Sequence, residues 1–173
     1  QIVCRELGIK NLDEIAEKVP AGSAGLTFLP YLCGSTMPKY NPDAKGAFMG
    51  LTMEHTRAHA VRSILESVAC MLKANLDYLG VSCNEIRSMG GGASSPLWCQ
   101  IKADMTGKNI AILENNETAC LGSAILAGVG VGIFKDVKSV CEKIVKIKKV
   151  YTPGDTDYSE CYKNFCNMED KIV

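Results

Sequence analysis

The sequence has no excess of charge of either sign and no long hydrophobic run. Its 173 residues carry 19 lysines and arginines against 19 aspartates and glutamates, so the net charge is zero. A balanced surface has no general attraction for nucleic acid or an anionic membrane, and we expect neither as a partner. No apolar run reaches the roughly 18 residues that a membrane span requires. Any anion that this protein binds must therefore be held by local geometry.

The cysteines lack a recognisable pattern. Nine are present, at positions 4, 33, 70, 83, 99, 120, 141, 161 and 166. The number is odd, and no pair has the C-x-x-C spacing that is typical of zinc and redox sites. Because unpaired cysteine is among the most often buried residue types, we expect small core residues in a reduced, cytoplasmic protein. Disulfides or a metal site are the alternative.

An obvious catalytic constellation is also missing. No Ser-His-Asp, Cys-His or paired-carboxylate pattern is evident. His55 and His59 have the one-turn spacing of a metal pair, but no motif places a third ligand, so we expect a solvated or cap-proximal helix face, with a metal pair as the alternative. Asp104 and Glu117 have structural explanations within or near a helix. The chain begins with Gln instead of Met, and we expect it to be a piece of a longer protein, with a processed N-terminus as the alternative.

Hydrophobic periodicity predicts an α/β fold. A long helix over 55–79 has apolar residues at i, i+3, i+4 and i+7, and Gly80 stands at its expected end. After it the predicted strands and helices alternate, which favours a sheet covered by crossover helices. The other expected elements are a helix over 12–19, a strand within 26–32, strands over 85–89 and 109–113, and helices over 96–106, 118–131 and 155–168.

Three further segments have more than one interpretation. The proline- and glycine-rich segment 33–52 predicts a long surface loop, either functional or a plain connector. The lysine-rich stretch 143–150 is expected to be a solvated face, with an anionic partner as the alternative. "GVGVG" at 128–132 follows a helix instead of a strand, so close helix packing or unwinding of the helix end is expected there in place of a phosphate loop.

The glycine run between the strand at 85–89 and the following helix is the main candidate for ligand binding. Gly90, Gly91 and Gly92 carry no Cβ, so a ligand can approach the backbone closely. Ser95 is a good N-cap and Pro96 a good first helical residue, and a helix start presents free N–H groups. The dinucleotide pattern G-x-G-x-x-G fails because Ser95 occupies the third glycine position. Nucleotide contact and a tight strand-to-helix turn therefore both remain open.

Three stretches in sequence order resemble the C-terminal domain of the FGGY carbohydrate kinases. They are "LPYLCGSTMPKYNPDAKGAFMGLTMEHTRAHAVRSILESVA", "GGGASSPLWCQIKADMTG" and "ETACLGSAILAG". The resemblance covers nearly all of residues 1–173. It implies an α/β domain of the actin-like ATPase, ribonuclease H-like fold, forming the C-terminal, adenosine-binding lobe of a two-lobed sugar kinase that uses ATP and Mg²⁺. Its other expected partners are the sugar, the missing N-terminal lobe and a homo-oligomeric copy.

The resemblance also implies which residues bind the nucleotide. Gly90, Gly91, Gly92 and Ala93 would lie along the adenine and ribose of ATP, and Ser94, Ser95 and Pro96 would shape the helix start beside them. On the other side, Asn116, Glu117 and Gly122 would close the site. The general base and the first phosphate motif belong to the N-terminal lobe, and the second phosphate motif would precede residue 1. The chain alone is therefore expected to be inactive.

The sugar is less well defined by the resemblance. It is greatest to the members that phosphorylate D-xylulose to D-xylulose 5-phosphate, but the loop at Gly34, Ser35, Thr36, Met37 and Pro38 has lost two charges that are common there. Glycerol, gluconate and ribulose are alternative substrates. A non-catalytic actin-like module that binds a nucleotide is the alternative from another class.

Overall fold

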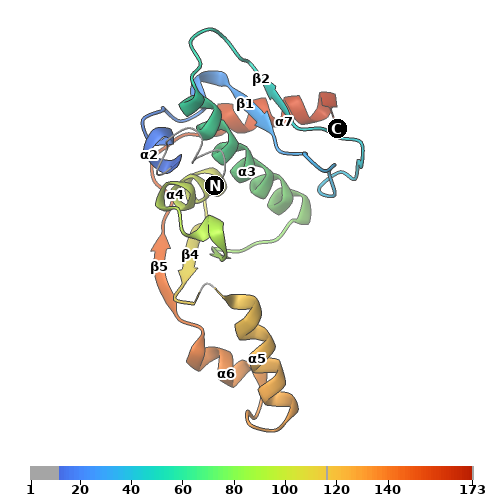
Figure 1. Ribbon diagram of the computed structural model, residues 1–173, viewed down its shortest axis with the longest axis vertical. Helices are drawn as coiled ribbons and strands as arrows, with labels where there is room; N and C mark the ends of the chain where they lie inside the picture. Colours follow the sequence, from blue (N-terminus) through green and yellow to red (C-terminus); the bar gives the residue numbers. More distant parts are fainter. Residues whose placement is uncertain (1–11, 116, 173) are drawn as a thin grey trace.

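Two small sheets lie on either side of a pair of packed helices in the computed structural model, which describes residues 12–115 and 117–172. From one end of the molecule to the other come the β1–β2 hairpin with α7, then α3, α4, the β3–β4–β5 sheet and the α5–α6 hairpin (Figure 1). The mixed α/β architecture agrees with the fold predicted from the sequence. None of the described helices is both long and apolar enough to cross a membrane.

The first half of the chain builds a layer around the long helix. This half contains α2 (Leu12–Ala16), the short 3-10 helix η1 (Ser23–Gly25), β1 (Thr27–Leu29), β2 (Ala47–Met49) and α3 (Arg57–Leu79). β1 and β2 pair antiparallel, with Phe28 opposite Phe48. The predicted long helix is confirmed, and Gly80 ends it in the left-handed conformation expected of a C-cap glycine.

The two histidines organise the turns that precede α3. Nδ1 of His55 accepts a hydrogen bond from the Thr52 amide at 2.9 Å, and Nδ1 of His59 accepts one from the Thr56 amide at 3.2 Å. The rings meet edge to face at 5.3 Å. Within the described part of the chain, no three His, Cys, Asp or Glu side chains gather as a metal site would require. His59 thus belongs to the capping box at the start of α3, whereas His55 lies before the helix, in the turn that its ring closes on Thr52.

The second half contains the alternating strands and helices. It comprises β3 (Glu85–Ser88), the 3-10 turn η2 (Gly91–Ala93), α4 (Pro96–Thr106), β4 (Asn109–Leu113), α5 (Thr118–Gly130), α6 (Val137–Ile144), β5 (Ile147–Tyr151) and α7 (Ser159–Ile172). β3 and β4 run parallel and are joined through α4, whereas β5 pairs antiparallel with β4. The elements predicted from 85 to 131 are confirmed within one residue.

Two strands, one α-helix and both 3-10 helices were not predicted, α7 is displaced, and α2 ends at Ala16 where the prediction extended to residue 19. β2, α6 and β5 are absent from the sequence-based prediction. β5 is an exposed edge strand of the sheet. Its lysines carry charges, and charged side chains on an edge strand prevent it from pairing with a strand of another molecule. α7 begins at Ser159, not near 155, because the preceding connection stays extended where the Gly154 amide donates to Asp104 Oδ1 at 2.8 Å.

Two clusters of buried side chains hold these layers together. The larger one joins β1, α3, α4 and α7 around Leu29, Ile101 and Phe165. A smaller one packs Cys99 and Ala103 of α4 on β4. The core assignment of the cysteines holds for Cys70 and Cys99, but it is wrong for Cys33 and Cys120, which are exposed. The cysteines at 83, 141, 161 and 166 are half-buried, and position 4 lies outside the described residues.

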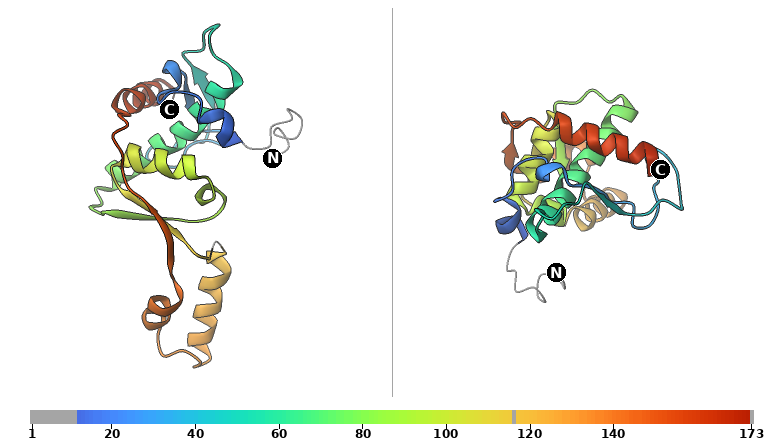
Figure 2. Two further views of the ribbon diagram at one scale, coloured as in Figure 1. Left: turned by 90° about the vertical axis from the view of Figure 1, so that its left-hand side faces the viewer. Right: turned by 90° about the horizontal axis from the view of Figure 1, so that it is seen from above.

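The α5–α6 hairpin projects from the β4–β5 end of the molecule (Figures 1 and 2). A Cβ on Gly128 would lie 2.5 Å from the ring of Phe134, so this glycine permits the close packing that was predicted for "GVGVG". Much of the remaining apolar surface of the hairpin faces outward, with Leu126, Val131 and Ile133 all exposed. The hairpin therefore has little hydrophobic burial of its own.

Candidate functional site

The candidate site lies at the edge of the sheet where β3 and β4 end. Because these strands are parallel neighbours, the segments that follow them emerge at the same edge, where ligands of open α/β sheets usually bind. The glycine turn follows β3, and the start of α5 follows β4. The hydroxyl of Thr118 donates to Met89 Sδ at 3.0 Å, which joins the two segments directly. Sequence positions almost thirty residues apart thus meet.

The turn itself is a short 3-10 helix bounded by an unusual glycine. Gly90 has φ 74° and ψ −164°, a conformation that residues with a Cβ rarely adopt. The amides of Ala93 and Ser94 donate to the carbonyls of Gly90 and Gly91, each at 3.1 Å. Space beside Gly90 and Gly91 is open within 4 Å, whereas a Cβ on Gly92 would lie 3.0 Å from the Trp98 ring. One side of the turn is therefore packed, and the other is accessible.

The start of α4 has the predicted capping. Ser95 Oγ accepts a hydrogen bond from the Trp98 amide at 3.0 Å and donates one to Asp13 Oδ2 at 2.6 Å. Pro96 occupies the first turn of the helix, where its missing N–H costs nothing. Indole Nε1 of Trp98 also donates to the Leu65 carbonyl on α3 at 3.0 Å. These contacts fix the helix start relative to α2 and α3.

A pocket of about 280 Å³ adjoins the turn on the side of β4 and β5. Ala93, Ser94 and Pro96 of the predicted site line it, together with residues from the two strands and their connections: Ile112, Leu113, Glu114, Lys148, Lys149 and Tyr151. The ammonium of Lys149 lies 4.3 Å from the centre of the Tyr151 ring. The pocket combines an aromatic face, apolar strand residues, two lysines and one glutamate, so its lining keeps a net positive charge that suits a flat ligand with negative charge.

The remaining predicted residues lie at the start of α5. Glu117 is the N-cap of this helix, is exposed, and makes no side-chain capping bond. Gly122 lies one turn into the helix with open space beside its Cα. Neither residue lines the 280 Å³ pocket. Asn116 lies outside the described residues.

Lys102 and Trp98 of α4 contact the turn at Gly92. Neither residue was predicted from the sequence to belong to the site. The Lys102 ammonium donates to Ser88 Oγ at 3.0 Å and to the Gly92 carbonyl at 3.2 Å. Burial lowers the pKa of this ammonium, and burial also raises the pKa of the neighbouring Cys99 thiol. One feature of the sequence could have indicated the role of Lys102. It stands between Ile101 and Ala103, on the apolar face of α4, where a charged residue is unexpected.

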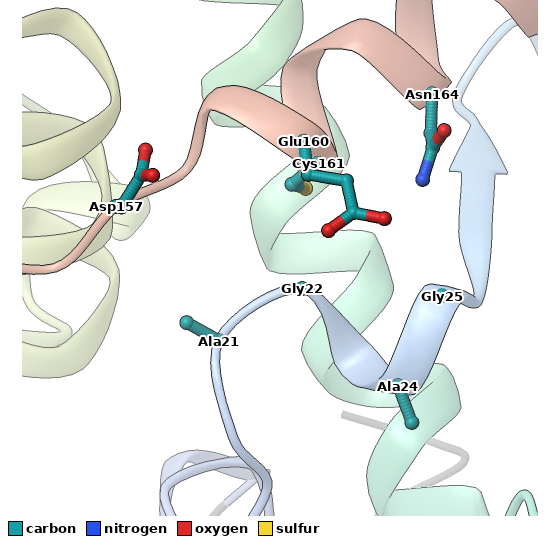
Figure 3. A pocket seen from close by; sticks show the side chains of 8 residues that line it. All are labelled: Ala21, Gly22, Ala24, Gly25, Asp157, Glu160, Cys161 and Asn164. Atoms are coloured by element: carbon teal, nitrogen blue, oxygen red, sulfur yellow. The ribbon is translucent and has the colours of Figure 1, made fainter.

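A larger pocket of about 380 Å³ lies elsewhere, between the η1 turn and the start of α7 (Figure 3). Asp157, Glu160, Cys161 and Asn164 line it opposite the loop from Ala21 to Gly25. No basic side chain and none of the predicted site residues takes part in this lining. An acidic pocket repels phosphate groups, so it does not compete with the glycine turn as a nucleotide site.

Comparison with known proteins identifies the family. Residues 5–131 match the C-terminal domain of the FGGY family of carbohydrate kinases. The chain is 32% identical to a xylulose kinase of Staphylococcus epidermidis over 161 residues, which are 91% of the chain and 32% of the relative. It is 36% identical to a gluconokinase of Bacillus subtilis and 35% identical to a glycerol kinase of Bdellovibrio bacteriovorus, each over 80% of the chain and 28% of the relative.

Solved structures show the same fold. The structure of a ligand-bound xylulose kinase from Lactobacillus acidophilus superposes with a TM-score of 0.82 at 25% identity, over 92% of this chain and 34% of that one. A xylulose kinase from Rhodospirillum rubrum superposes with a TM-score of 0.75 at 32% identity, over 92% and 33%. The chain thus spans about a third of the length of the proteins it matches.

Proposed function

We propose that this chain, which belongs to the FGGY family of carbohydrate kinases and has the actin-like fold of their C-terminal domain, supplies the adenosine-binding side of an ATP-dependent sugar kinase. The observation that carries this proposal is the sheet edge at which the open glycine turn after β3 meets the start of α5 after β4. Among the described residues, this edge offers backbone and a pocket to a nucleoside, and we propose that the groups that carry out the chemistry lie in the second lobe.

The residues of the turn fit the nucleoside part of ATP. A Cβ on Gly90 or Gly91 would have no other atom within 4 Å, so a ring or ribose can approach the backbone there. Ala93, Ser94 and Pro96 add the wall of the neighbouring pocket. Bound ATP would supply the phosphoryl group to be transferred, and these residues would orient its nucleoside end.

The described part of the chain contains no cluster of side chains that could bind Mg²⁺. No group of three candidate ligand side chains gathers there. Mg²⁺, when bound, would neutralise the charge on the phosphates; we propose that the groups that hold the metal and the phosphates, like the general base, lie in the second lobe. The partners proposed for the chain are therefore the sugar, the nucleotide and a second, N-terminal lobe.

D-xylulose is the substrate that we propose first, since the xylulose kinase of Staphylococcus epidermidis matches a longer part of this chain than the gluconokinase or the glycerol kinase does. Gluconate and glycerol follow, because a gluconokinase and a glycerol kinase have similar identity. Ribulose is a further candidate.

A substrate panel tests the proposal in two steps. ATP-dependent phosphorylation of D-xylulose, gluconate, glycerol and ribulose is measured with the kinase that combines this chain with an N-terminal lobe, and then with the 173-residue chain alone. We expect turnover of one preferred sugar by the two-lobed protein and none by the chain alone. Turnover by the chain alone would contradict the proposal that the catalytic groups lie in the second lobe. A two-lobed protein that binds ADP but phosphorylates no sugar would favour a non-catalytic module.

A further inference from the structure

Lys102 is a buried cation directly beneath the glycine turn. We propose that it is a positioning residue of the nucleotide site: its ammonium holds the Gly92 carbonyl, and its positive charge makes the turn favour a phosphate-bearing nucleotide over a free nucleoside. This inference rests on the proposed function and adds to it a residue that sets ligand preference.

Helix geometry explains how a residue in the middle of α4 reaches the turn before it. Side chains on a helix lean toward its N-terminus, and residues four apart share a face. The Lys102 ammonium therefore extends back to Ser88 at the end of β3 and to the Gly92 carbonyl, at 3.0 and 3.2 Å. Trp98, one turn earlier, has its ring centre 5.2 Å from the ammonium and packs on Gly92. Lys102 and Trp98 together support one side of the turn.

The charge of Lys102 is not balanced locally. The residue is only 8% exposed, both hydrogen-bond acceptors are neutral, and none of the ion pairs among the described residues includes it. Its ammonium, which reaches the Gly92 carbonyl, also lies toward the positive end of the α4 dipole. Burying a charge without a counter-charge is costly, and a methionine of similar length would fill the same space without that cost. The site therefore retains an excess of positive charge that an anionic ligand can offset.

The titratable groups around Lys102 do not change this balance. Cys99, one turn earlier on α4, is a buried thiol whose pKa is raised, so it stays neutral near pH 7. The charge of Asp13 on α2 raises the pKa of the Cys99 thiol, and the charge of Lys149 on β5 lowers it. Since burial lowers the pKa of Lys102, its charge is lost at a lower pH than that of an exposed lysine.

Fluorescence tests the position of the charge without any nucleotide. Trp98 is the only tryptophan of the chain, so its emission reports on the turn. We expect the emission maximum of the unsubstituted chain to shift between pH 7 and 11, with a midpoint below the value of about 10.4 that is usual for lysine. The shift should be smaller in Lys102→Met and unchanged in Lys108→Met, which removes the lysine that follows the C-cap of α4. An unchanged shift in Lys102→Met would overturn the proposal.

Ligand titration tests the preference. ADP and adenosine are titrated by calorimetry into the unsubstituted chain and both variants. Lys102→Met should weaken ADP binding by about tenfold, as expected for the loss of one partly screened charge, and change adenosine binding by less than about twofold. Lys108→Met should change neither. Equal losses for both ligands, or no loss for either, would overturn the proposal.

The two measurements also separate this inference from the function on which it rests. If the unsubstituted chain binds neither ligand, the proposed function and the ligand preference both fail. The fluorescence shift would still decide whether the charge of Lys102 acts on the turn.

Discussion

Neighbouring glycines in the turn differ in what they require. Gly90 has φ 74° with ψ −164°, which is accessible mainly to glycine, whereas Gly91 has an ordinary φ and open space around it. We predict that Gly90→Ala lowers the free energy of unfolding by about 1–3 kcal/mol and that Gly91→Ala changes it by less than about 0.5 kcal/mol. Urea unfolding followed by circular dichroism measures both. Equal stability of the two variants would contradict the conformation assigned to Gly90.

The buried ion pair between Arg62 and Glu66 of α3 leads to a second prediction for single residues. Glu66 accepts hydrogen bonds from Arg62 Nε at 2.7 Å, from the Gly22 amide at 2.9 Å and from Ser23 Oγ at 2.8 Å. Glu66→Gln would leave the Arg62 charge buried without its partner, so we expect a loss of about 3–5 kcal/mol in the free energy of unfolding.

An exposed ion pair provides the control for this variant. Lys39 and Asp170 are bonded at the surface, with half or more of each side chain exposed. Asp170→Asn should therefore cost less than about 1 kcal/mol in the same unfolding measurement. A similar cost for both variants would show that burial is not what gives the Arg62–Glu66 pair its importance.

At the scale of elements, α7 is fastened to the rest of the fold by tyrosine hydroxyls. Tyr31 donates to Glu169 on this helix, Tyr162 of the helix donates to Asp77 of α3 at 2.9 Å, and Arg62 donates to the hydroxyl of Tyr158 at 2.6 Å. Burial raises the pKa of Tyr158 to about 12, and burial with the nearby carboxylates raises the pKa of Tyr31 and Tyr162 as well. Tyr31 and Tyr162 can donate these bonds only while their hydroxyls are protonated, whereas the Tyr158 hydroxyl accepts its bond from Arg62.

The pH dependence of stability follows from these raised pKa values. Between the unfolded tyrosine pKa of about 10 and the folded value, the folded chain binds more protons, so its stability falls as pH rises. We predict constant stability from these groups below about pH 10 and a progressive loss between about pH 10 and 12. Tyr162→Phe should make the loss shallower. Urea unfolding at pH 8 to 11 measures this, and a stability that rises over this interval would contradict the assignment.

Some helices and strands could be predicted from the sequence, and others could not. Residues 55–131 were predicted well because apolar periodicity, Gly80, Ser95 and Pro96 are local signals that the tertiary structure leaves in place. β5 was missed because its two lysines and outward-facing apolar residues belong to an edge strand, which lacks the alternation of a half-buried one. Lys102 could not be assigned to the turn because only the fold brings the middle of α4 back to Gly92.

For the whole molecule, the α5–α6 hairpin is a projecting part that leaves large apolar side chains exposed. Leu126, Val131 and Ile133 are 63%, 75% and 73% exposed, so they offer an apolar surface for association. We predict that the purified chain self-associates with increasing concentration and that Leu126→Glu with Ile133→Glu weakens this by at least about tenfold in dissociation constant. Sedimentation velocity measures both. A chain that stays monomeric, or variants that associate unchanged, would contradict this role of the hairpin.

The central claim is that the glycine turn and the start of α5 receive the adenosine of ATP. Photolabelling with 2-azido-ADP, followed by peptide mapping, tests it most directly because the label records where the base lies even when binding is weak. We predict label within residues 89–98 or 113–122, and its loss when excess ADP competes. Label within residues 21–25 or 157–164, at the acidic pocket of Figure 3, or label that ADP does not reduce, would contradict this claim.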